Sequence, residues 1–588
     1  MVNLTINHIP VTVEEGTTIL EAARANNIDI PSLCYLKDLN EIGACRVCCV
    51  EIEGENKLVP SCNNVVAEGM SVLTNSPRAR RARRTNLELL LCQHDANCTA
   101  CSRNGGCQLQ KLAADLNINQ SAFGKDLPSA TLRRWPMDHP LIRDSAKCIK
   151  CMRCVQVCDK MQTLNIWDLS GTGSRTRIDT SHNRLISEAD CSLCGQCITH
   201  CPTGALQERD DTDEVIRAIE DPNRLTVVQI APAVRTALAE ALGLEPNAIS
   251  VNHLAAALKR LGIDYVFDTS FTADLTIMEE GTEFLHRLEA GELKDYPMFT
   301  SCCPGWVRFL KSQYPELTCM LSTAKSPQQM FGALSKSWFA RSVDRSPEEI
   351  TSISIMPCTA KKAESALPTM KNANGIREVD VVLTTREVLR MLQANQVDIT
   401  SIEEEPFDDL MNHSTGAGVI FGATGGVMEA ALRSAHYLVT GTNAPADAFA
   451  DVRARESDEH AWREATFDLQ GAPIRVAIAS GLGNARALCE AILAGKAHYD
   501  FVEIMACPGG CSGGGGQPIR MDDAEKAAER AEILYGLDQI SDLRYSHENP
   551  DVDRLYKEFL IRPNSHAAHE LLHTDHFGWD MPKPDKSR

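Results

Sequence analysis

The first residues alternate between apolar and polar side chains. Residues 2–13 read VNLTINHIPVTV, a period-two pattern that predicts two strands joined as a hairpin. Thr18 and Glu21 have the spacing of a capping box, which predicts a helix that ends near residues 26–27. The chain therefore opens with two strands and a helix, and cysteine-rich segments follow.

The pattern changes beyond about residue 212. Continuous apolar runs at 227–230 (VVQI) and 381–385 (VVLTT) predict buried strands, and residues 252–261 have helical periodicity. Residues 276–287 also read as a helix. An amphipathic helix is expected at 547–560 near the C-terminus. This half is predicted to be α/β.

Composition excludes several classes of protein. A chain of 588 residues is too long for one core and suggests three to five domains. The net charge of −20 argues against nucleic-acid binding. One local exception is a basic run, for which a solvated helix face is favoured over a docking patch for an acidic electron carrier. It consists of Arg78, Arg80, Arg81, Arg83 and Arg84.

The N-terminus has no basic segment followed by an apolar one, and no apolar run reaches about 18 residues. We therefore expect a soluble cytoplasmic protein with no membrane contact. The 24 cysteines are the strongest feature of the composition. In a large cytoplasmic chain they indicate metal binding or chemistry more than disulfides.

The first cysteine group follows the predicted hairpin and helix. Its spacing suits a [2Fe–2S] cluster in a β-grasp ferredoxin domain over residues 1–78. The predicted ligands are Cys34, Cys45, Cys48 and Cys62. Cys49 is interpreted as a packing residue.

A second group contains one histidine and three cysteines, in a domain predicted at 79–140. Spacing alone is compatible with zinc or with a [4Fe–4S] cluster. Because cluster motifs lie before and after it, we favour the cluster. Its predicted ligands are His94, Cys98, Cys101 and Cys107.

Two bacterial ferredoxin runs follow, in a domain predicted at 141–211. In such runs the fourth cysteine of each run binds the other cluster. One [4Fe–4S] cluster is predicted to bind Cys148, Cys151, Cys154 and Cys201. The other is predicted to bind Cys191, Cys194, Cys197 and Cys158.

The cluster-bearing half by itself resembles the large cluster subunit of respiratory complex I and the front end of some formate dehydrogenases. The second half contains three further motifs: TSCCPGW at 300–306, MPCTAKKAE at 356–364 and EIMACPGGCSGGGGQP at 503–518. In this order, behind this cluster array, they closely resemble the three signatures of [FeFe]-hydrogenases. The resemblance covers essentially the whole chain.

The resemblance implies an H-cluster, in which a [4Fe–4S] cubane is bridged to a two-iron subsite carrying CO, CN⁻ and a dithiolate. The implied cubane ligands are Cys303, Cys358, Cys507 and Cys511, the last being the bridge. The implied fold is multidomain α+β and α/β. A β-grasp domain, a domain for the cluster bound by histidine and three cysteines, and a two-cluster ferredoxin domain precede the α/β H-cluster domain at 212–530. A C-terminal wrapping extension, similar to the family's small subunit, follows at 531–588.

The resemblance also implies roles for residues near the cubane. Cys302 would be the acid/base that exchanges protons with the dithiolate amine, since environment tunes a thiol pKa. Lys361 would hydrogen-bond a cyanide ligand, and Glu364 would orient Lys361.

A proton relay is implied between the surface and Cys302. Its members would be Glu283 beside Arg287, then Ser322, Glu280 and Cys302. The alternative is that the carboxylates are solvated surface charge. The motif context favours the relay.

Three further residues resemble those that line the two-iron subsite, although each could equally be core packing, and two more that follow the strand at 227–230 are expected to reach the same pocket. They are Gln328, Met356, Met505, Ala231 and Pro232. Four tail histidines resemble a metal site, but no partner stands at a recognised spacing, so a surface wrap is favoured. They are His566, His569, His573 and His576.

These features predict reversible oxidation of H2 at the H-cluster, with one [2Fe–2S] and three [4Fe–4S] clusters as a wire. The non-catalytic alternative is an iron–sulfur assembly or H2-sensing protein. The electron partner is either ferredoxin or flavin- and NAD(P)-binding subunits of an electron-bifurcating complex, slightly favoured. The chain has no G-x-G-x-x-G fingerprint of its own. Maturation proteins are expected partners because the family installs its two-iron subsite with them.

Overall fold

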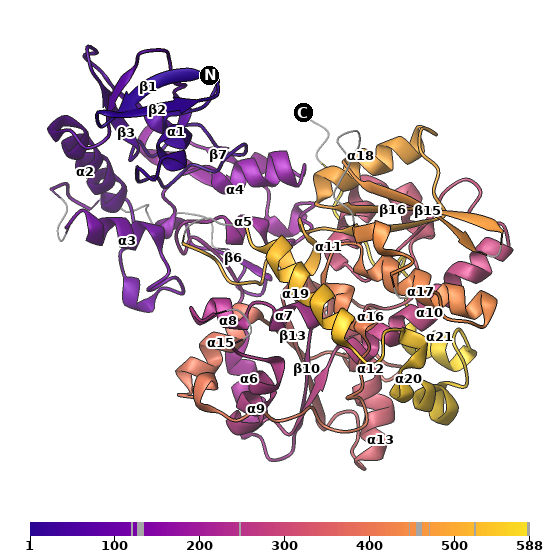
Figure 1. The fold of residues 1–588 in the computed structure, drawn as a ribbon. Coiled ribbons are helices and arrows are strands. Elements are labelled where there is room, and N and C mark those ends of the chain that lie inside the picture. Colours follow the sequence, from indigo (N-terminus) through magenta and orange to yellow (C-terminus); the bar gives the residue numbers. More distant parts are fainter. Residues whose placement is uncertain are drawn as a thin grey trace. The chain divides into compact units, whose positions relative to one another are not determined.

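The computed structural model describes most of the chain. The described residues are 1–118, 122–125, 135–245, 248–445, 447–453, 461–469, 471–521 and 525–584. The chain divides into two compact units (Figure 1). The first unit comprises Met1–Ser187, Gln196–Gln207 and Ile519–Ala524; the second comprises Glu188–Gly195, Glu208–Pro518 and Glu525–Arg588.

The first unit begins with a five-stranded sheet in the order β2-β1-β5-β3-β4. Its strands are β1 (Val2–Ile6), β2 (Ile9–Val13), β3 (Cys49–Ile52), β4 (Leu58–Pro60) and β5 (Ser71–Leu73). The antiparallel β1–β2 hairpin confirms the prediction from alternation. Helix α1 (Ile19–Ala25) is capped by Thr18, whose hydroxyl accepts a hydrogen bond from the Glu21 backbone N–H.

Helix α2 (Pro77–Cys92) contains the arginine run. The interpretation of this run as a solvated face is wrong for Arg83, which is buried. The Arg83 guanidinium donates to the carbonyls of Val47 at 3.0 Å and Thr74 at 2.9 Å, so it replaces its lost hydration with protein acceptors.

The rest of the first unit consists of short elements between cysteine-bearing loops. They are α3 (Gln108–Asp115), β6 (Leu141–Arg143), α4 (Arg153–Gln156), β7 (Trp167–Ser170), β8 (Arg177–Thr180), α5 (Gln196–Thr199) and β9 (Leu206–Glu208). A π-helical turn, Val157–Met161, continues α4. Helices and strands are short here because they alternate with the loops that carry the cysteines.

The second unit contains two four-stranded sheets. The first is wholly parallel, in the order β11-β10-β13-β14, with strands β10 (Leu225–Ile230), β11 (Tyr265–Asp268), β13 (Ile350–Met356) and β14 (Val381–Thr384). The second has the order β12-β17-β16-β15, with strands β12 (Met298–Phe299), β15 (Arg463–Leu469), β16 (Ala472–Ser480) and β17 (Phe501–Met505). Only β15 runs antiparallel to its neighbour among these described strands. The predicted α/β half is thus confirmed.

Helices cover both faces of the first sheet (Figure 1). One face packs against α6 (Thr212–Glu220), α9 (Val251–Leu261) and α15 (Thr385–Ala394). The other packs against α10 (Ser270–Glu289), α12 (Pro327–Leu334) and the C-terminal helices. Every residue of β13 is buried, as expected for a central parallel strand.

The remaining helices of the second unit connect or cover these sheets. They are α7 (Pro232–Arg235), α8 (Leu238–Ala241), α11 (Pro304–Gln313), α13 (Ala340–Ser342), α14 (Ala360–Glu364), α16 (Gly416–Val419), α17 (Gly426–Thr440) and α18 (Leu482–Leu493). No described helix is long and apolar enough to cross a membrane.

The C-terminal segment contains α19 (Ala527–Ile540), α20 (Pro550–Leu555) and α21 (His566–Leu572). The prediction of one helix over 547–560 is wrong at both ends. Ser546–Glu548 form a separate 3-10 turn before Pro550, and Tyr556–Leu560 form a π-helical turn. Proline at the first helical position favours the start of a new helix, and the hydrophobic periodicity of the sequence does not reveal that boundary.

Candidate active site

The three catalytic motifs lie at the carboxyl ends of parallel strands. Cys358 comes two residues after β13, and Cys507 two residues after β17. Cys303 follows β12 and is the N-cap of α11, whereas Cys511 lies in the 3-10 turn Gly510–Gly513. Carboxyl ends of parallel strands are where α/β folds gather functional groups. Rigid buried strands therefore present all four predicted cubane ligands.

The charges of neighbouring cysteines raise the pKa values of these thiols. Burial, followed by the charge of Cys303, raises the pKa of Cys358 to about 12. Burial and the charges of Cys303 and Cys358 also raise the pKa of Cys511. The Ala506 N–H, next to Cys507, donates to the Cys303 sulfur at 3.4 Å. Clustered buried thiolates are unfavourable unless a polyvalent cation neutralises them, so this donor set fits an iron–sulfur cubane.

The glycine run after Cys511 lets backbone approach backbone. A Cβ on Gly516 would lie 2.8 Å from the backbone nitrogen of Cys358, which is closer than real Cβ contacts allow. Any side chain there would separate two of the cysteine-bearing segments. The run therefore has a packing reason that composition alone does not provide.

Lys361 is buried next to these cysteines. Its ammonium donates to the Cys302 carbonyl at 3.0 Å and to the Glu364 carboxylate at 3.0 Å. Burial, the largest single influence, lowers the pKa of Lys361, but the charge and hydrogen bond of Glu364 together with the charges of Cys358 and Cys302 raise it overall. Gln328 Nε2 donates to the same carboxylate at 3.0 Å, and its Oε1 has no partner among the described residues. Lys361, Glu364 and Gln328 thus form one buried polar group.

The predicted relay residues lie on α10 and on the loop before α12. The Ser322 hydroxyl donates to Glu283 Oε2 at 2.8 Å, and Arg287 donates to Glu283 Oε1 at 2.6 Å. Neither oxygen of buried Glu280 makes a well-formed hydrogen bond among the described residues, although Ser322 and the Ser301 backbone lie near enough to oppose the rise of its pKa. Burial first, and then the charge of Glu283, raises the pKa of Glu280 to about 8. Glu280 is therefore an acid that holds its proton at neutral pH.

Cys302 lies at the inner end of this series. Burial raises its pKa well above the usual range, and the charge of Glu280 raises it further. The two side chains are close enough to interact electrostatically, but no hydrogen bond joins them. A proton between them must pass through a small movement or a water molecule.

The predicted lining residues fall into two clusters. Met505 packs in the same hydrophobic cluster as Cys302 and Cys303. Met356 and Ala231 belong to another cluster, against which Cys358 packs, and Pro232 is the buried first residue of α7. All are core residues that also border the cysteine-bearing segments.

Known proteins resemble this chain along its whole length. A family model described as the C-terminal domain of the iron-only hydrogenase large subunit matches residues 224–515. The NADP-reducing hydrogenase subunit HndD of Solidesulfovibrio fructosivorans is 44% identical over 98% of this chain and 99% of its own length. The chain belongs to the iron-only, or [FeFe], hydrogenase family.

Other relatives extend this comparison. Iron hydrogenase 1 of Clostridium pasteurianum is 36% identical over 97% of this hydrogenase and 99% of its own length. The cytosolic iron-sulfur assembly component 3 of Mus musculus is 31% identical over 68% of this chain and 85% of its own length. An apo variant of [FeFe]-hydrogenase HydA1 from Chlamydomonas reinhardtii gives a TM-score of 0.56 at 40% identity, covering 63% of this chain and 99% of that one.

Models of accessory domains match the rest of the hydrogenase. They describe a 2Fe-2S cluster binding domain (1–77), an NADH-ubiquinone oxidoreductase-G iron-sulfur binding region (83–122), a 4Fe-4S dicluster domain (147–205) and an iron hydrogenase small subunit (524–579). These matches confirm the predicted fold class, cofactor types and enzyme class. The small-subunit-like segment is fused to the large subunit in this chain.

The four cysteines predicted to bind the [2Fe–2S] cluster face one another in the hydrogenase. Hydrogen bonds from Cys45 and Cys62 lower the pKa of Cys34. A hydrogen bond with Cys62 lowers that of Cys48 to about 7. Cys49 lies on β3 outside this set, and its pKa is raised, chiefly by burial.

The structure brings the members of the histidine-containing group together only in part. Burial raises the pKa of Cys107, and the nearby Cys101 charge adds to the rise. Cys98 begins the 3-10 turn Cys98–Ala100. His94 is buried, which lowers its pKa, and its Nδ1 has no partner among the described residues. A neutral imidazole with an unpaired ring nitrogen suits metal binding.

All four cysteines predicted to bind the first ferredoxin cluster line one small cavity of about 20 Å³. Its lining includes Cys148, Cys151, Cys154 and Cys201. For the second cluster, Cys191 and Cys194 belong to the second unit, whereas Cys158 and Cys197 belong to the first. That assignment stays a prediction.

Sequence reasoning missed Thr359. Its hydroxyl donates to the Leu193 carbonyl at 2.6 Å, which joins the residue after Cys358 to the turn between Cys191 and Cys194. The Cys507 sulfur also approaches the Cys194 carbonyl at 3.6 Å. Neither contact has a sequence signal, because both depend on how distant loops meet.

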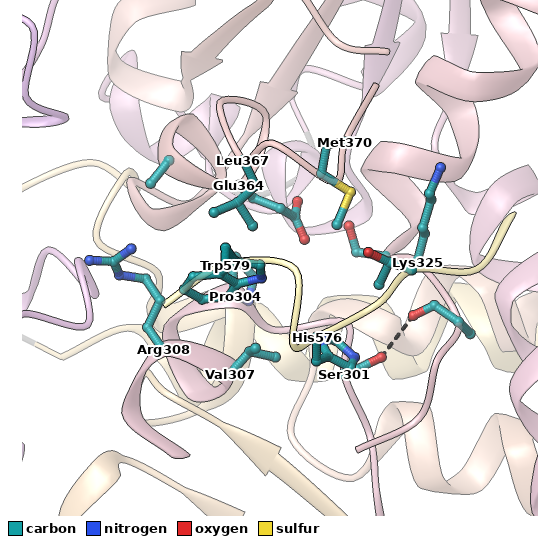
Figure 2. Close-up of a pocket in the computed structure, with 14 residues that line it drawn as sticks. Ser301, Pro304, Val307, Arg308, Lys325, Glu364, Leu367, Met370, His576 and Trp579 are labelled. Atoms are coloured by element: carbon teal, nitrogen blue, oxygen red, sulfur yellow. Dashed lines mark hydrogen bonds between the residues drawn. The ribbon is translucent and has the colours of Figure 1, made fainter. Parts of the chain in front are cut away.

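A cavity of about 20 Å³ lies behind Lys361's partner Glu364 (Figure 2). Lys325, His576 and Trp579 also line it, and the Ser301 hydroxyl donates to the Ala324 carbonyl beside it at 2.8 Å. Its volume suffices for one water molecule. Of the four tail histidines, His573 and His576 are buried, whereas His566 and His569 are exposed.

Proposed function

We propose that this hydrogenase exchanges protons with its H-cluster through Cys302. The observation that carries the proposal is the position of Cys302. It directly precedes the predicted ligand Cys303. Its carbonyl accepts a hydrogen bond from Lys361, and the charge of Glu280 raises the pKa of its thiol. When bound, the H-cluster supplies the iron at which two protons and two electrons are exchanged with H2.

The chain's own residues would each have one task. Glu283 receives a proton at the outer end, where Arg287 and Ser322 hold its carboxylate. Glu280 stores a proton because its pKa is about 8, and Cys302 passes the proton onward. Lys361, held by Glu364 and the Cys302 carbonyl, would offer its ammonium to an anionic ligand of the cluster. Gln328, Met356, Met505, Ala231 and Pro232 would keep water away from the cysteine-bearing segments that they border.

Electrons would travel through the accessory clusters in the predicted domains 1–78, 79–140 and 141–211, held by the cysteine and histidine ligands predicted above. The junction to the domain 212–530 would be the contact of Thr359 and Cys507 with the Cys191–Cys194 turn. The fused segment 531–588 would take the place of a small subunit.

The physiological electron partner would be a flavin- and NAD(P)-binding subunit of a multi-subunit, electron-bifurcating complex. Two observations support this proposal. A relative named as an NADP-reducing hydrogenase subunit covers the whole chain, and residues 83–122 match a region of NADH-ubiquinone oxidoreductase-G. The alternative partner is ferredoxin. A cytoplasmic location fits such a complex.

The test of the proposed function is H2 evolution from reduced methyl viologen by anaerobically matured protein, beside protein lacking the two-iron subsite. Turnover only after maturation supports the hydrogenase. Fully loaded but silent protein would favour the assembly role named for the relative in Mus musculus. For the partner, NADP⁺ reduction by H2 should require an added flavin subunit; reduction of ferredoxin alone would contradict the multi-subunit proposal.

A further inference from the structure

The C-terminal segment lies beside the outer end of the proposed relay. Its backbone pairs with residues 323–325 through an antiparallel bridge between Ala324 and His573. The Thr574 N–H donates to the Thr323 carbonyl at 2.8 Å, and the Lys325 N–H donates to the Leu572 carbonyl at 2.8 Å. Since Ser322 directly precedes this stretch, the pairing fixes His573 next to the relay.

His573 occupies a buried position between two polar groups. Its Nδ1 lies 2.8 Å from the Thr323 hydroxyl, and its Nε2 lies 3.1 Å from Glu279 Oε2. Glu279 is fully buried and also accepts hydrogen bonds from the Tyr556 hydroxyl at 2.6 Å and the Asn564 N–H at 2.8 Å. A buried imidazole paired with a carboxylate can hold a proton that the pair shares.

Thr323 connects this pair to the relay. Its hydroxyl contacts His573, and its backbone N–H donates to both oxygens of Glu283, at 3.0 and 3.2 Å. Glu279 and Glu283 also lie one turn apart on α10, so their carboxylates share one side of the helix.

Glu283 itself has little access to solvent. Its side chain is only 9% exposed, and that of its partner Arg287 only 15%. His576, another neighbour, binds the Ser322 carbonyl at 2.8 Å, and burial lowers its pKa. A neutral His576 engaged in that way stabilises the loop and lies outside the path. Direct access from solvent to Glu283 is thus narrow, and a second route would add to it.

His569 provides a solvent-facing group at the right place. It is exposed on α21, and its ring centroid lies 4.1 Å from that of His573. Burial, the charge of His573 and, least of the three, the charge of His566 lower the pKa of His569, whereas Glu279 and Glu283 oppose that shift. Two imidazoles in contact, one exposed and one buried, form a path from water to the carboxylates.

We propose that the C-terminal segment carries the proton inlet of this hydrogenase: a proton enters at His569, passes to His573, is held between His573 and Glu279, and reaches Glu283 beside Thr323. Each transfer moves one proton and no electron. The exposed His569 ring can turn, or one water can bridge, to complete the first transfer. One water molecule must also bridge the last transfer, because among the described residues no hydrogen bond joins His573 or Glu279 to the Glu283 carboxylate and the Thr323 backbone N–H cannot pass a proton. The inlet rests on the proposed relay from Glu283 to Cys302.

The test compares matured full-length variants with wild type in dye-driven H2 evolution between pH 6 and 9. His573→Gln preserves a hydrogen-bonding amide but carries no proton, and His569→Ala removes the exposed ring. His566→Ala is the matched control, because His566 lies on the same helix with an 88% exposed side chain. Thermal unfolding checks that each variant is folded.

Both inlet variants should lose about tenfold in turnover above pH 7.5, where protons are scarce, and added imidazole should restore most of it. The control should follow the wild-type profile. Wild-type pH profiles in both inlet variants would overturn the inlet while leaving the hydrogenase intact. An inactive matured wild type would instead count against the proposed function.

A second readout needs no turnover. Diethylpyrocarbonate modifies neutral imidazole, so its rate at His569, followed by mass spectrometry against pH, reports the pKa of that residue in the unmatured chain. We expect a pKa below the ordinary 6.5 in the wild type and a higher one in His573→Gln. Identical values in both proteins would contradict the contact on which the inlet depends.

Discussion

The cysteines of the first unit and those of the catalytic motifs are held in different ways. In the first unit, non-glycine residues with left-handed backbone stand beside the cysteines: Arg46 (φ 56°), Lys150 (φ 56°) and Met152 (φ 69°). In the three catalytic motifs, positive φ values occur only at Gly509 and Gly510. Non-glycine residues pay about 1–3 kcal/mol for such conformations. The accessory loops are strained, whereas the catalytic loops are not.

The hydrophobic cores of the two units also differ in how far they include predicted cluster ligands. One core of the first unit includes the predicted ligands Cys34, Cys45, Cys107 and Cys151 as members. In the second unit, the catalytic cysteines follow strands whose own cores consist largely of aliphatic residues. We infer that the clusters complete the fold of the first unit, whereas the fold of the second unit builds its site without them.

The largest expected effect is that of iron removal, which should affect the stability of the first unit much more than that of the second. In protein prepared anaerobically without iron, the first unit should lose structure because metal binding supplies part of its folding free energy. Limited proteolysis with mass spectrometry should then find cleavage across residues 30–187 of the first unit, while 224–515 stays resistant. Equal cleavage of both units would remove the distinction.

Next in size is the effect of Glu280→Gln on turnover. The amide fits the buried position but carries no proton, so H2 evolution should fall by about 100-fold or more. Electron paramagnetic resonance signals of the accessory clusters should not change. Glu289→Gln, at an exposed site on the same helix, is the control and should keep full activity.

Glu280 also predicts a pH dependence of stability. Its folded pKa of about 8 exceeds the ordinary 4.5, so between these values only the folded state binds the proton. The free energy of unfolding should therefore fall as pH rises through this window and be fully reduced above about 8, by a few kcal/mol in total. Thermal unfolding of unmatured protein at pH 5 and pH 8 should show a smaller difference in Glu280→Gln than in the wild type.

The smallest expected effect on active-site chemistry comes from His94→Cys. The substitution changes a ligand of one accessory cluster, so electron delivery from external donors should change. Exchange between H2 and D⁺ should stay close to wild type, because exchange needs no accessory electrons. Loss of exchange would mean that this cluster is required for the fold of the catalytic site.

Much of this architecture could be predicted from sequence. The hairpin at 2–13, the strand at 227–230 and the helix at 276–287 follow from periodicity. Cysteine spacing indicated the [2Fe–2S] and ferredoxin clusters, whereas the histidine-containing cluster also needed its neighbouring motifs and the H-cluster needed the family resemblance. Specific motifs located Cys302 and Cys303. Apart from those last two clusters, each of these features depends on residues that are close together in the sequence, so a short segment is enough to predict it.

Other features depend on tertiary contacts. Periodicity gave no warning that Tyr556–Leu560 form a π-helical turn or that Arg83 is buried against carbonyls. The tail histidines looked like surface residues because nothing in their spacing shows that residues 572–574 pair with 323–325. Likewise, the Thr359 contact with Leu193 joins residues 166 positions apart.

The measurement that tests the central account most directly is turnover by matured Cys302→Ser, with infrared bands of CO and CN⁻ recorded on the same sample. A serine hydroxyl is a far weaker acid than a thiol, so proton exchange should fail although the cluster assembles. We predict intact infrared bands and a loss of about 10²–10⁴-fold in H2 evolution. Undiminished turnover with intact bands would contradict the role of Cys302 and, with it, the relay through Glu280.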